Sequence, residues 1–231
     1  MSIATQDDKL YLFAFVHFLP GAYNSWQAAY DELAVHVWAH EPTTETYYFG
    51  LPLDFIDDVA NTPAMLAFEV YDTRDSLYNV HFVSEAMARG FLPKAVPNMM
   101  ASFDLQHYSR VAGFLDKPGD ARACGFMYDV KIECKSSDAR GRILARLREL
   151  GPKVEASELT ARGALLTWMG FASQDSDKDA RIFMRFRDKA AFQEYVRLQD
   201  VAGFWAAGKD EDIDKVQQRG YVENGRGWLH R

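Results

Sequence analysis

The fold is decided by residues 66–91, LAFEVYDTRDSLYNVHFVSEAMARGF. The first six residues are mostly apolar and β-branched or aromatic, which predicts a buried strand. A polar turn follows at residues 72–75. From there to Phe91, apolar residues recur at helical spacing, which predicts an amphipathic helix. We therefore expect a strand, a turn and a helix that covers the sheet.

A weaker copy of this unit occurs at residues 181–207. A strand that ends in charges again precedes a helix with an apolar stripe. Phe192, Tyr195 and Leu198 fall where Tyr78, His81 and Ser84 fall in the first copy. His81 therefore has no histidine counterpart, and a repeated unit carries a titratable group only once.

The same periodicity predicts two repeats of the order β-α-β-β-α-β. The expected strands are residues 9–20, 43–50, 63–72, 102–114, 125–134, 163–173, 181–188 and 216–229, and the expected helices are residues 25–41, 75–91, 138–150 and 189–207. This order is that of the ferredoxin-like fold. We predict an α+β protein in which the antiparallel sheets of two ferredoxin-like repeats pack into a pseudo-dimeric α+β barrel.

A proline-glycine turn among charges, residues 116–120, is the best linker in the chain. It divides the protein into an N-terminal repeat, residues 1–117, and a C-terminal repeat, residues 118–231. The N-terminal repeat keeps the histidine, so we expect the active half there. The C-terminal repeat is expected to be degenerate.

Composition limits the function classes. The chain has 231 residues, 48% of them hydrophobic, with a formal net charge of −7 and a pI near 5.4. Nucleic acids and anionic membranes attract concentrated positive charge, so neither is an expected partner. The two cysteines lie ten residues apart on one expected strand and cannot bridge each other. Free thiols and the lack of a signal peptide or membrane-spanning run predict a cytoplasmic protein.

Two short motifs carry a family resemblance. Residues 41–47, EPTTETY, resemble the Glu-Pro-Gly-Thr-x-x-Tyr signature of the antibiotic biosynthesis monooxygenases, with Thr43 in place of the glycine. Tyr78, His81 and Ser84 resemble the Phe-x-x-His-x-x-Ser of that family's second helix. The chain looks like a tandem, two-copy member of the family, in the dimeric α+β barrel superfamily. Such a chain would be a monomer with an internal pseudo-dimer, or a homodimer.

The resemblance implies a pocket between the sheet and the helices. His81 is the expected catalytic base, because partial burial on the helix stripe would lower its pKa. Tyr47 is the second catalytic candidate, as a donor to an oxyanion, although both residues also fit a structural role in the core. Expected substrate-binding residues are Trp38, Tyr78, His107 and His17. Strand parity leaves open whether Phe15 and His17, or Ala14 and Val16, face the pocket.

Cofactors are not expected. His36 and His40 are four apart, but no third ligand follows at a convincing spacing. In the haem-degrading relatives, the iron ligand falls at the position of Phe91, and a tryptophan falls at that of His81. No glycine-rich phosphate loop is present.

Three functional hypotheses remain. The first is a cofactor-independent monooxygenase of secondary metabolism that acts on an apolar aromatic or phenolic, polyketide-like substrate, with dioxygen as co-substrate. The second is a cyclase, isomerase or dehydratase that uses the same pocket and base without oxygen. The third is a non-catalytic protein that binds a small apolar ligand. Dependence on dioxygen separates the first two.

Overall fold

The computed structural model describes residues 8–116 and 123–231. They form two compact units. The first unit contains residues 8–107 together with residues 223–231, and the second unit contains the described part of residues 108–222. The boundary expected between residues 117 and 118 lies outside the described residues.

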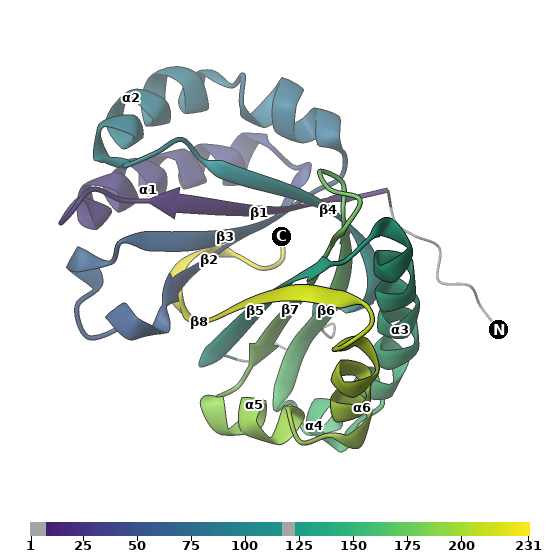
Figure 1. Ribbon diagram of the computed structural model, residues 1–231. Coiled ribbons are helices and arrows are strands. Elements are labelled where there is room, and N and C mark those ends of the chain that lie inside the picture. The colour runs from purple at the N-terminus through teal and green to yellow at the C-terminus, as the bar shows by residue number, and fades with distance from the viewer. Residues whose placement is uncertain (1–7, 117–122) are drawn as a thin grey trace. The chain divides into compact units, whose positions relative to one another are not determined.

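The first unit is a sheet covered by helices (Figure 1). Its elements are β1 (Leu10–His17), α1 (Tyr23–His40), β2 (Thr44–Pro52), η1 (Leu53–Phe55), η2 (Val59–Asn61), β3 (Ala64–Tyr71), η3 (Ser76–His81), η4 (Ala86–Phe91), α2 (Leu92–Ala95), η5 (Val96–Asn98) and the start of β4 (Asp104–Phe114). Strand β3 pairs antiparallel with both β1 and β2. Helices α1 and α2 lie on one face of these strands.

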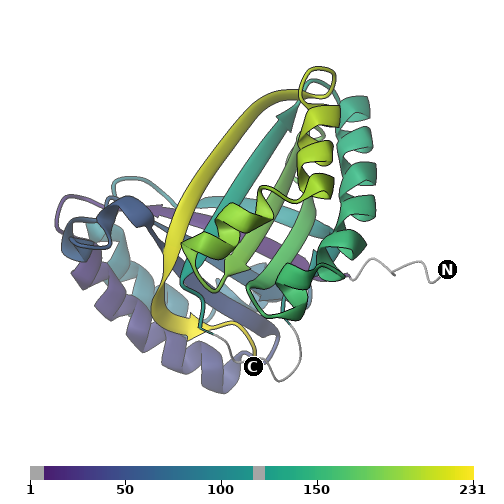
Figure 2. The same cartoon turned by 90° about the horizontal axis from the view of Figure 1, so that it is seen from below.

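The second unit repeats this order with the remaining strands. It contains the rest of β4, then β5 (Phe126–Cys134), α3 (Ser137–Glu155), α4 (Glu158–Ala161), β6 (Leu165–Ser173), β7 (Asp179–Phe186), α5 (Lys189–Tyr195), α6 (Gln199–Gly208) and most of β8 (Ile213–Trp228). Strand β7 pairs antiparallel with β5 and β6, and β8 pairs with β5. Figure 2 shows the long β8 beside β5, and α6 beside α3.

The expected fold is confirmed. Hydrogen bonding joins the strands in the order β1-β3-β2-β8-β5-β7-β6-β4, which closes on itself, so the connectivity is that of an antiparallel barrel. The boundary between the units falls within β4, after His107, and within β8, after Val222. Each expected strand is present, with ends that differ by a few residues from the expected ones. The difference arises because a sequence pattern locates the middle of an element better than its ends.

The helix that follows β3 departs from the expected geometry. Segments η3 and η4 are π-helical, with the amide of Phe82 donating to Leu77 O and that of Leu92 to Met87 O, five residues back. A wider turn moves the buried stripe. Met87 is buried and Ala88 is exposed, whereas a regular α-helix that buried both His81 and Phe91 would also turn Ala88 toward the sheet. Such π-helical turns are uncommon and occur mostly at functional sites.

Three other helix expectations needed correction. The N-cap of α1 is Ala22, with no side-chain cap, so the helix begins two residues before its expected start at residue 25. The helix expected at residues 189–207 is two helices, α5 and α6, because the chain turns at residues 196–198. The short helix α4 had no sequence prediction; Ser157 caps it by accepting from Thr160 N.

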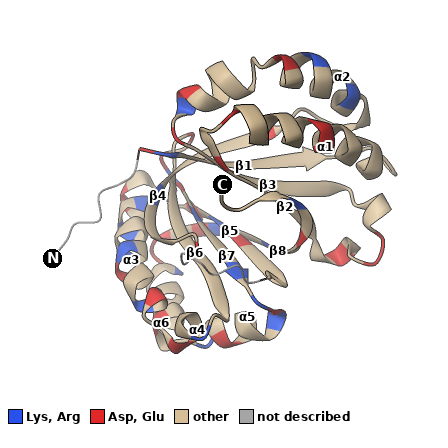
Figure 3. Ribbon diagram, turned by 180° about the vertical axis from the view of Figure 1, so that it is seen from behind, with Lys and Arg blue, Asp and Glu red and all other residues tan. Residues whose placement is uncertain are grey.

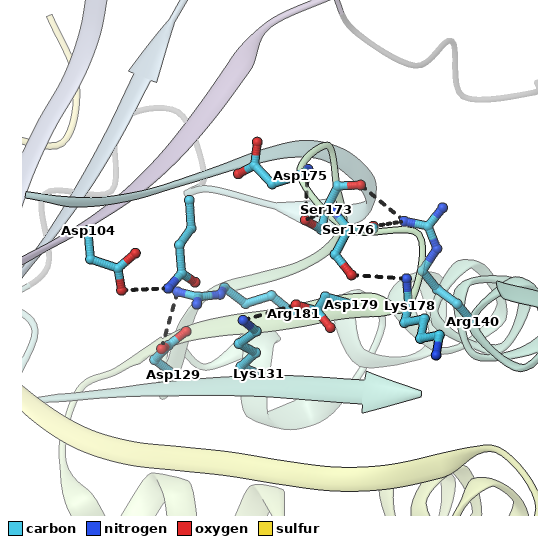
Figure 4. A network of polar contacts seen from close by, with 11 residues as sticks. Asp104, Asp129, Lys131, Arg140, Ser173, Asp175, Ser176, Lys178, Asp179 and Arg181 are labelled. Atoms are coloured by element: carbon cyan, nitrogen blue, oxygen red, sulfur yellow. Dashed lines mark hydrogen bonds and ion pairs between the residues drawn. The ribbon is translucent and has the colours of Figure 1, made fainter. Parts of the chain in front are cut away.

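Charge is distributed differently over the two sheets. Strand β1 carries no Asp, Glu, Lys or Arg, and β3 carries only Glu69 (Figure 3). In the second unit, by contrast, β5 and β7 place Asp129 beside Arg181 at 3.4 Å and Lys131 beside Asp179 at 2.9 Å (Figure 4). Buried pairs such as Asp129 and Arg181 constrain packing more than they stabilise it.

Among the described residues, every helix is too short or too polar to cross a membrane. Cys124 and Cys134 are both buried and form no disulfide bond, and they lie just before and at the end of β5. They therefore sit at opposite ends of one extended strand, as expected.

Candidate functional site

A small cavity lies between the sheet and the helices of the first unit. Its volume is about 30 Å³, room for about two water-sized molecules. The lining side chains come from every layer of the unit: Leu12, Ala14, Val16, Trp26, Tyr30, Tyr47, Phe49, Ala67, Glu69, His81, Phe82, Met87, Phe91, Phe103 and Leu105. Most are apolar, so the few polar side chains that reach the cavity stand in a setting of low polarity.

His81 lies at the end of η3, only 2% exposed, and its ring is held from both sides. Nδ1 lies 2.7 Å from Glu41 Oε2. Because an ionised carboxylate only accepts hydrogen bonds, Nδ1 carries the proton in this pair. In the neutral ring, Nε2 then presents its lone pair, so Glu41 fixes the tautomer that can accept a proton at Nε2.

Tyr47 lies beside Nε2. Its hydroxyl is 3.5 Å from that nitrogen, at the limit of a hydrogen bond, and the two ring centroids are 5.7 Å apart. Complete burial raises the pKa of Tyr47 well above its usual value, with Glu69 and Glu41 adding to the effect. The hydroxyl therefore stays protonated and can donate to an oxygen anion as well as to His81.

Glu69 is the second acid-base group that lines the cavity. It is 6% exposed, and the hydroxyl of Tyr71 donates to its Oε2 at 2.7 Å. Burial raises the pKa of Glu69 to about 7, against the lowering effects of His81 and the Tyr71 hydrogen bond. A carboxyl with such a pKa exchanges protons near neutral pH.

Residues 223–231 pack against the residues that form this site. The Trp228 ring lies 5.5 Å from that of Tyr47. A guanidinium nitrogen of Arg231 donates to Val37 O at 3.1 Å, and another donates to Glu41 O. Gly227 runs so close to Tyr47 that an added Cβ would lie 1.8 Å from its carbonyl oxygen. The segment thus holds the backbone at both Glu41 and Tyr47.

Comparison with known structures gives the fold of the whole chain. A "putative monooxygenase" from Lactobacillus acidophilus NCFM aligns with a TM-score of 0.73 and 11% identity over 96% of this chain and 97% of its own. One from Fusobacterium nucleatum aligns with a TM-score of 0.75, again at 11% identity over 96% and 97% of the chains. The chain has the fold of these proteins. At this level of identity the likeness is one of fold alone.

A third structure with this fold is described as an "anthrone oxidase-like protein". It aligns with a TM-score of 0.64 and 12% identity over 96% of this chain and 94% of its own. Neither a family model nor a curated protein matches the sequence. The two-repeat fold that the motif resemblance implied is thus confirmed over both repeats.

The structure brings the two expected catalytic residues together, and it settles which face of β1 lines the cavity. Leu12, Ala14 and Val16 face the cavity. His17, on the opposite parity, is exposed at the end of the strand. It therefore does not line the cavity, although it was an expected substrate-binding residue.

The other three expected substrate-binding residues also lie away from the cavity. Trp38 is 49% exposed and packs edge-on against Trp228 at 5.0 Å. Tyr78 is half-exposed, and its hydroxyl lies 2.7 Å from His107 Nε2. Trp38 and Tyr78 are exposed on their helices. His107 has the same parity as Leu105, which lines the cavity, but lies two residues further along β4, beside Tyr78. Contact with substrate remains a prediction for all three.

No cluster of three or more metal-ligating side chains exists within residues 8–116 and 123–231. His36 and His40 lie with ring centroids 4.8 Å apart, without a third ligand. Phe91, at the position of the iron ligand in the haem-degrading relatives, is 2% exposed and packs edge-on against Trp26 at 5.5 Å. Phe91 thus belongs to the aromatic core between α1 and η4.

Two functional candidates were missed from the sequence. Glu41 appeared only as part of the resemblance motif and as a helix stop, and its partner His81 lies forty residues away. Glu69 carried a usable signal, because a lone carboxylate inside an apolar strand is rare unless it is paired or functional. Parity would also have placed it on the same face as Tyr71.

Proposed function

We propose that this protein is a cofactor-independent monooxygenase of secondary metabolism, acting on an apolar aromatic or phenolic substrate. The observation that carries the proposal is the Glu41–His81 pair, which presents Nε2 at an apolar cavity. The likeness to proteins described as a "putative monooxygenase" and an "anthrone oxidase-like protein" supports it.

The first step is proton abstraction from an acidic carbon or phenol by His81 Nε2. Glu41 stabilises the imidazolium that forms, because its carboxylate accepts from Nδ1 at 2.7 Å. The hydroxyl of Tyr47 donates to the oxygen that takes up the negative charge. The apolar lining keeps water from the anion, which strengthens both interactions.

The second step uses dioxygen. The substrate carbanion gives one electron to dioxygen, and the resulting radical pair combines into a carbon-bound peroxide. Loss of the remaining hydrogen from that carbon, with cleavage of the O–O bond, gives a carbonyl group and releases one water. One oxygen atom thus enters the product and the other leaves as water, so no external reductant is needed.

Glu69 is suited to donate the proton that O–O cleavage requires. It lines the cavity, and its pKa near 7 leaves it partly protonated at neutral pH. Tyr71 orients it by donating to Oε2. The carboxyl delivers a proton to the departing oxygen, which leaves as water.

Because the cavity is small, we assign dioxygen and the aromatic substrate to different places. A space of about 30 Å³ accepts dioxygen but not an aromatic ring system, since pockets for drug-sized ligands are about 300–1,000 Å³. Phe82, Phe103 and Leu105 are the half-buried lining residues. The aromatic substrate enters by displacing these three side chains, which brings its reacting carbon beside His81.

The test is dioxygen consumption with anthrone as substrate. We expect stoichiometric uptake of dioxygen, a carbonyl product labelled by ¹⁸O₂, and full activity after treatment with metal chelators. Full turnover under anaerobic conditions would reject the oxygenase.

A second candidate is an isomerase, which the presence of two acid-base groups on one cavity favours. His81 and Glu69 together are able to remove a proton from one atom of a substrate and return one to another. In that case deuterium from solvent enters the product and dioxygen does not. The anaerobic assay therefore decides between the two reactions.

A further inference from the structure

The second unit has its own cavity in the layer between sheet and helices. It has a volume of about 250 Å³, roughly eight times that of the cavity beside His81. Tyr128 and Met184 form its floor on β5 and β7, and Phe192, Val196 and Trp205 form its helical side. The elements around it are the repeat equivalents of those around the first cavity, apart from the first helix and the second strand.

The walls of this cavity are aromatic. The rings of Tyr128 and Phe192 lie 4.4 Å apart, and Phe192 also packs against Phe126 at 5.1 Å. Trp205, half-buried, adds an indole on the side of α6. Flat aromatic surfaces of this kind favour a flat apolar ligand, because ring pairs gain from stacked and edge-on contacts beyond the area that they bury.

The cavity excludes charged ligands. None of its lining side chains is a carboxylate, an amine or a guanidinium. Tyr195 is deeply buried, and its hydroxyl oxygen accepts a hydrogen bond from Trp168 Nε1 at 2.8 Å. Burial raises the pKa of Tyr195 above its usual value, so it stays neutral. An ion placed here would lose hydration without gaining a counter-charge.

Two polar groups mark one side of the cavity. Burial raises the pKa of the Tyr128 hydroxyl, so this group stays a donor. Gln218 is an exposed residue of β8 and supplies an amide at the rim. A single hydroxyl or carbonyl group at the edge of a ligand would meet these groups, while its rings lie against Phe192 and Trp205.

We propose that this cavity binds an uncharged aromatic molecule of one or two fused rings that carries a hydroxyl or carbonyl group at its edge. A dry apolar cavity of about 150 Å³ is enough for benzene in another protein, so about 250 Å³ suits a larger ring system. The site lacks the acid-base groups of the first unit. It is therefore a binding site, and it does not depend on the proposed oxygenase activity.

The test is isothermal titration of the full chain with 2-naphthol. A ligand of this size is expected to bind with a Kd of about 100 μM, within the range of small ligands of moderate efficiency. Naphthalene-2-carboxylate has the same rings and a negative charge, and we expect it to bind at least tenfold more weakly. Equal affinity for both compounds would contradict the proposal.

The matched variants are Val196→Trp and Val80→Trp. Val196 is 45% exposed and lines this cavity. Val80, on η3, is 42% exposed and lines neither this cavity nor the one beside His81. We expect Val196→Trp to weaken 2-naphthol binding at least tenfold by filling the cavity, with Val80→Trp unchanged. Undiminished binding to Val196→Trp, or no binding to the unmodified chain, would overturn the proposal.

Two further variants test the proposal if Val196→Trp does not fold. Gln218→Ala changes an exposed residue, and Tyr128→Phe keeps the ring and removes the hydroxyl. Both are expected to weaken binding about three- to tenfold through loss of a hydrogen bond to the ligand. His81→Ala is expected to bind 2-naphthol at this site as the unmodified chain does, which separates the proposal from the chemistry of the first unit.

Discussion

The two units place different side chains at the same positions of one scaffold. In the first unit, Glu69 is paired across the sheet with Leu12 on one side and with Tyr47 on the other. The corresponding row of the second unit is Tyr128, Met184 and Trp168. The row that carries the Glu69 carboxyl in the first unit thus corresponds to a row without a carboxyl in the second unit.

One contact persists in both units. The helix after the third strand of each repeat reaches the second strand, through His81 and Tyr47 in the first unit and through Tyr195 and Trp168 in the second. The second contact is shorter, 2.8 Å against 3.5 Å, and it joins two side chains that carry no charge. The scaffold needs a polar contact at this point, whereas acid-base chemistry needs Glu41 and Glu69 in addition.

The largest effect is expected from the removal of His81, which has no histidine counterpart in the second unit. We expect His81→Gln to lower kcat with anthrone about 100- to 10,000-fold, the usual contribution of a general base. Glutamine still donates to Glu41, so the fold is preserved, which circular dichroism checks. The matched change Tyr195→Phe is expected to leave kcat unchanged. A comparable loss from both variants would show that the contact matters only for structure.

The next largest effect concerns stability and pH. Burial raises the folded-state pKa of Glu69 to about 7, from an ordinary value of 4.5. Below pH 4.5 the carboxyl is protonated in both states, and stability does not change. Between these values the unfolded state ionises first, so the free energy of unfolding falls as pH rises, by roughly 3 kcal/mol in total.

Glu69→Gln removes this loss. Urea denaturation is expected to show that the variant is more stable than the unmodified chain at pH 8 and close to it at pH 4.5. Glu85→Gln is the control, because the Glu85 side chain is 79% exposed and its removal should not alter the pH dependence. A pH dependence that survives in Glu69→Gln would show that this carboxyl ionises normally in the fold.

Glu41→Gln tests the orientation of the base. An amide offers a donor as well as an acceptor to Nδ1, so it no longer selects one tautomer of His81. We expect kcat to fall about 10- to 100-fold with little change in KM, together with an altered pH profile of kcat. An unchanged profile with lower kcat would mean that Glu41 only supports packing.

The smallest effect is expected from Arg231→Ala. Loss of two hydrogen bonds to the carbonyls of Val37 and Glu41 should cost about 1 kcal/mol of stability and lower kcat about three- to tenfold. Arg226→Ala is the control, since that guanidinium pairs with Asp31 at 3.3 Å, away from the cavity. Similar kcat values for both variants would remove Arg231 from the support of the site.

Most of the fold was predictable because alternation and helical spacing are local properties. Strands and helices were expected in the right order, including the repeat of residues 66–91. The π-helical turns were not, because they depend on how Leu77 and Met87 accept hydrogen bonds in the packed helix. The break between α5 and α6 was missed for a similar reason: no proline or glycine marks residues 196–198.

The site was predictable only in part. Tyr47 and His81 were expected together through the two motifs, and the structure places them 3.5 Å apart. The pairing of His81 with Glu41 depends on the docking of η3 against the end of α1, which no local pattern contains. Trp38 and His17 were expected at the pocket on their chemistry, but parity and helix face turn them outward.

The division of β8 between the units has a consequence for how the site responds to dilution. Trp228 and Arg231 brace Tyr47 and Glu41, yet they follow the second repeat in the chain. If residues 118–231 were a separate chain, this brace would form by association and would be lost at low concentration. Covalent continuity makes its formation intramolecular, with an effective concentration set by the tether. The site around His81 is therefore braced to the same extent at any protein concentration, because the second repeat carries the bracing segment in the same chain.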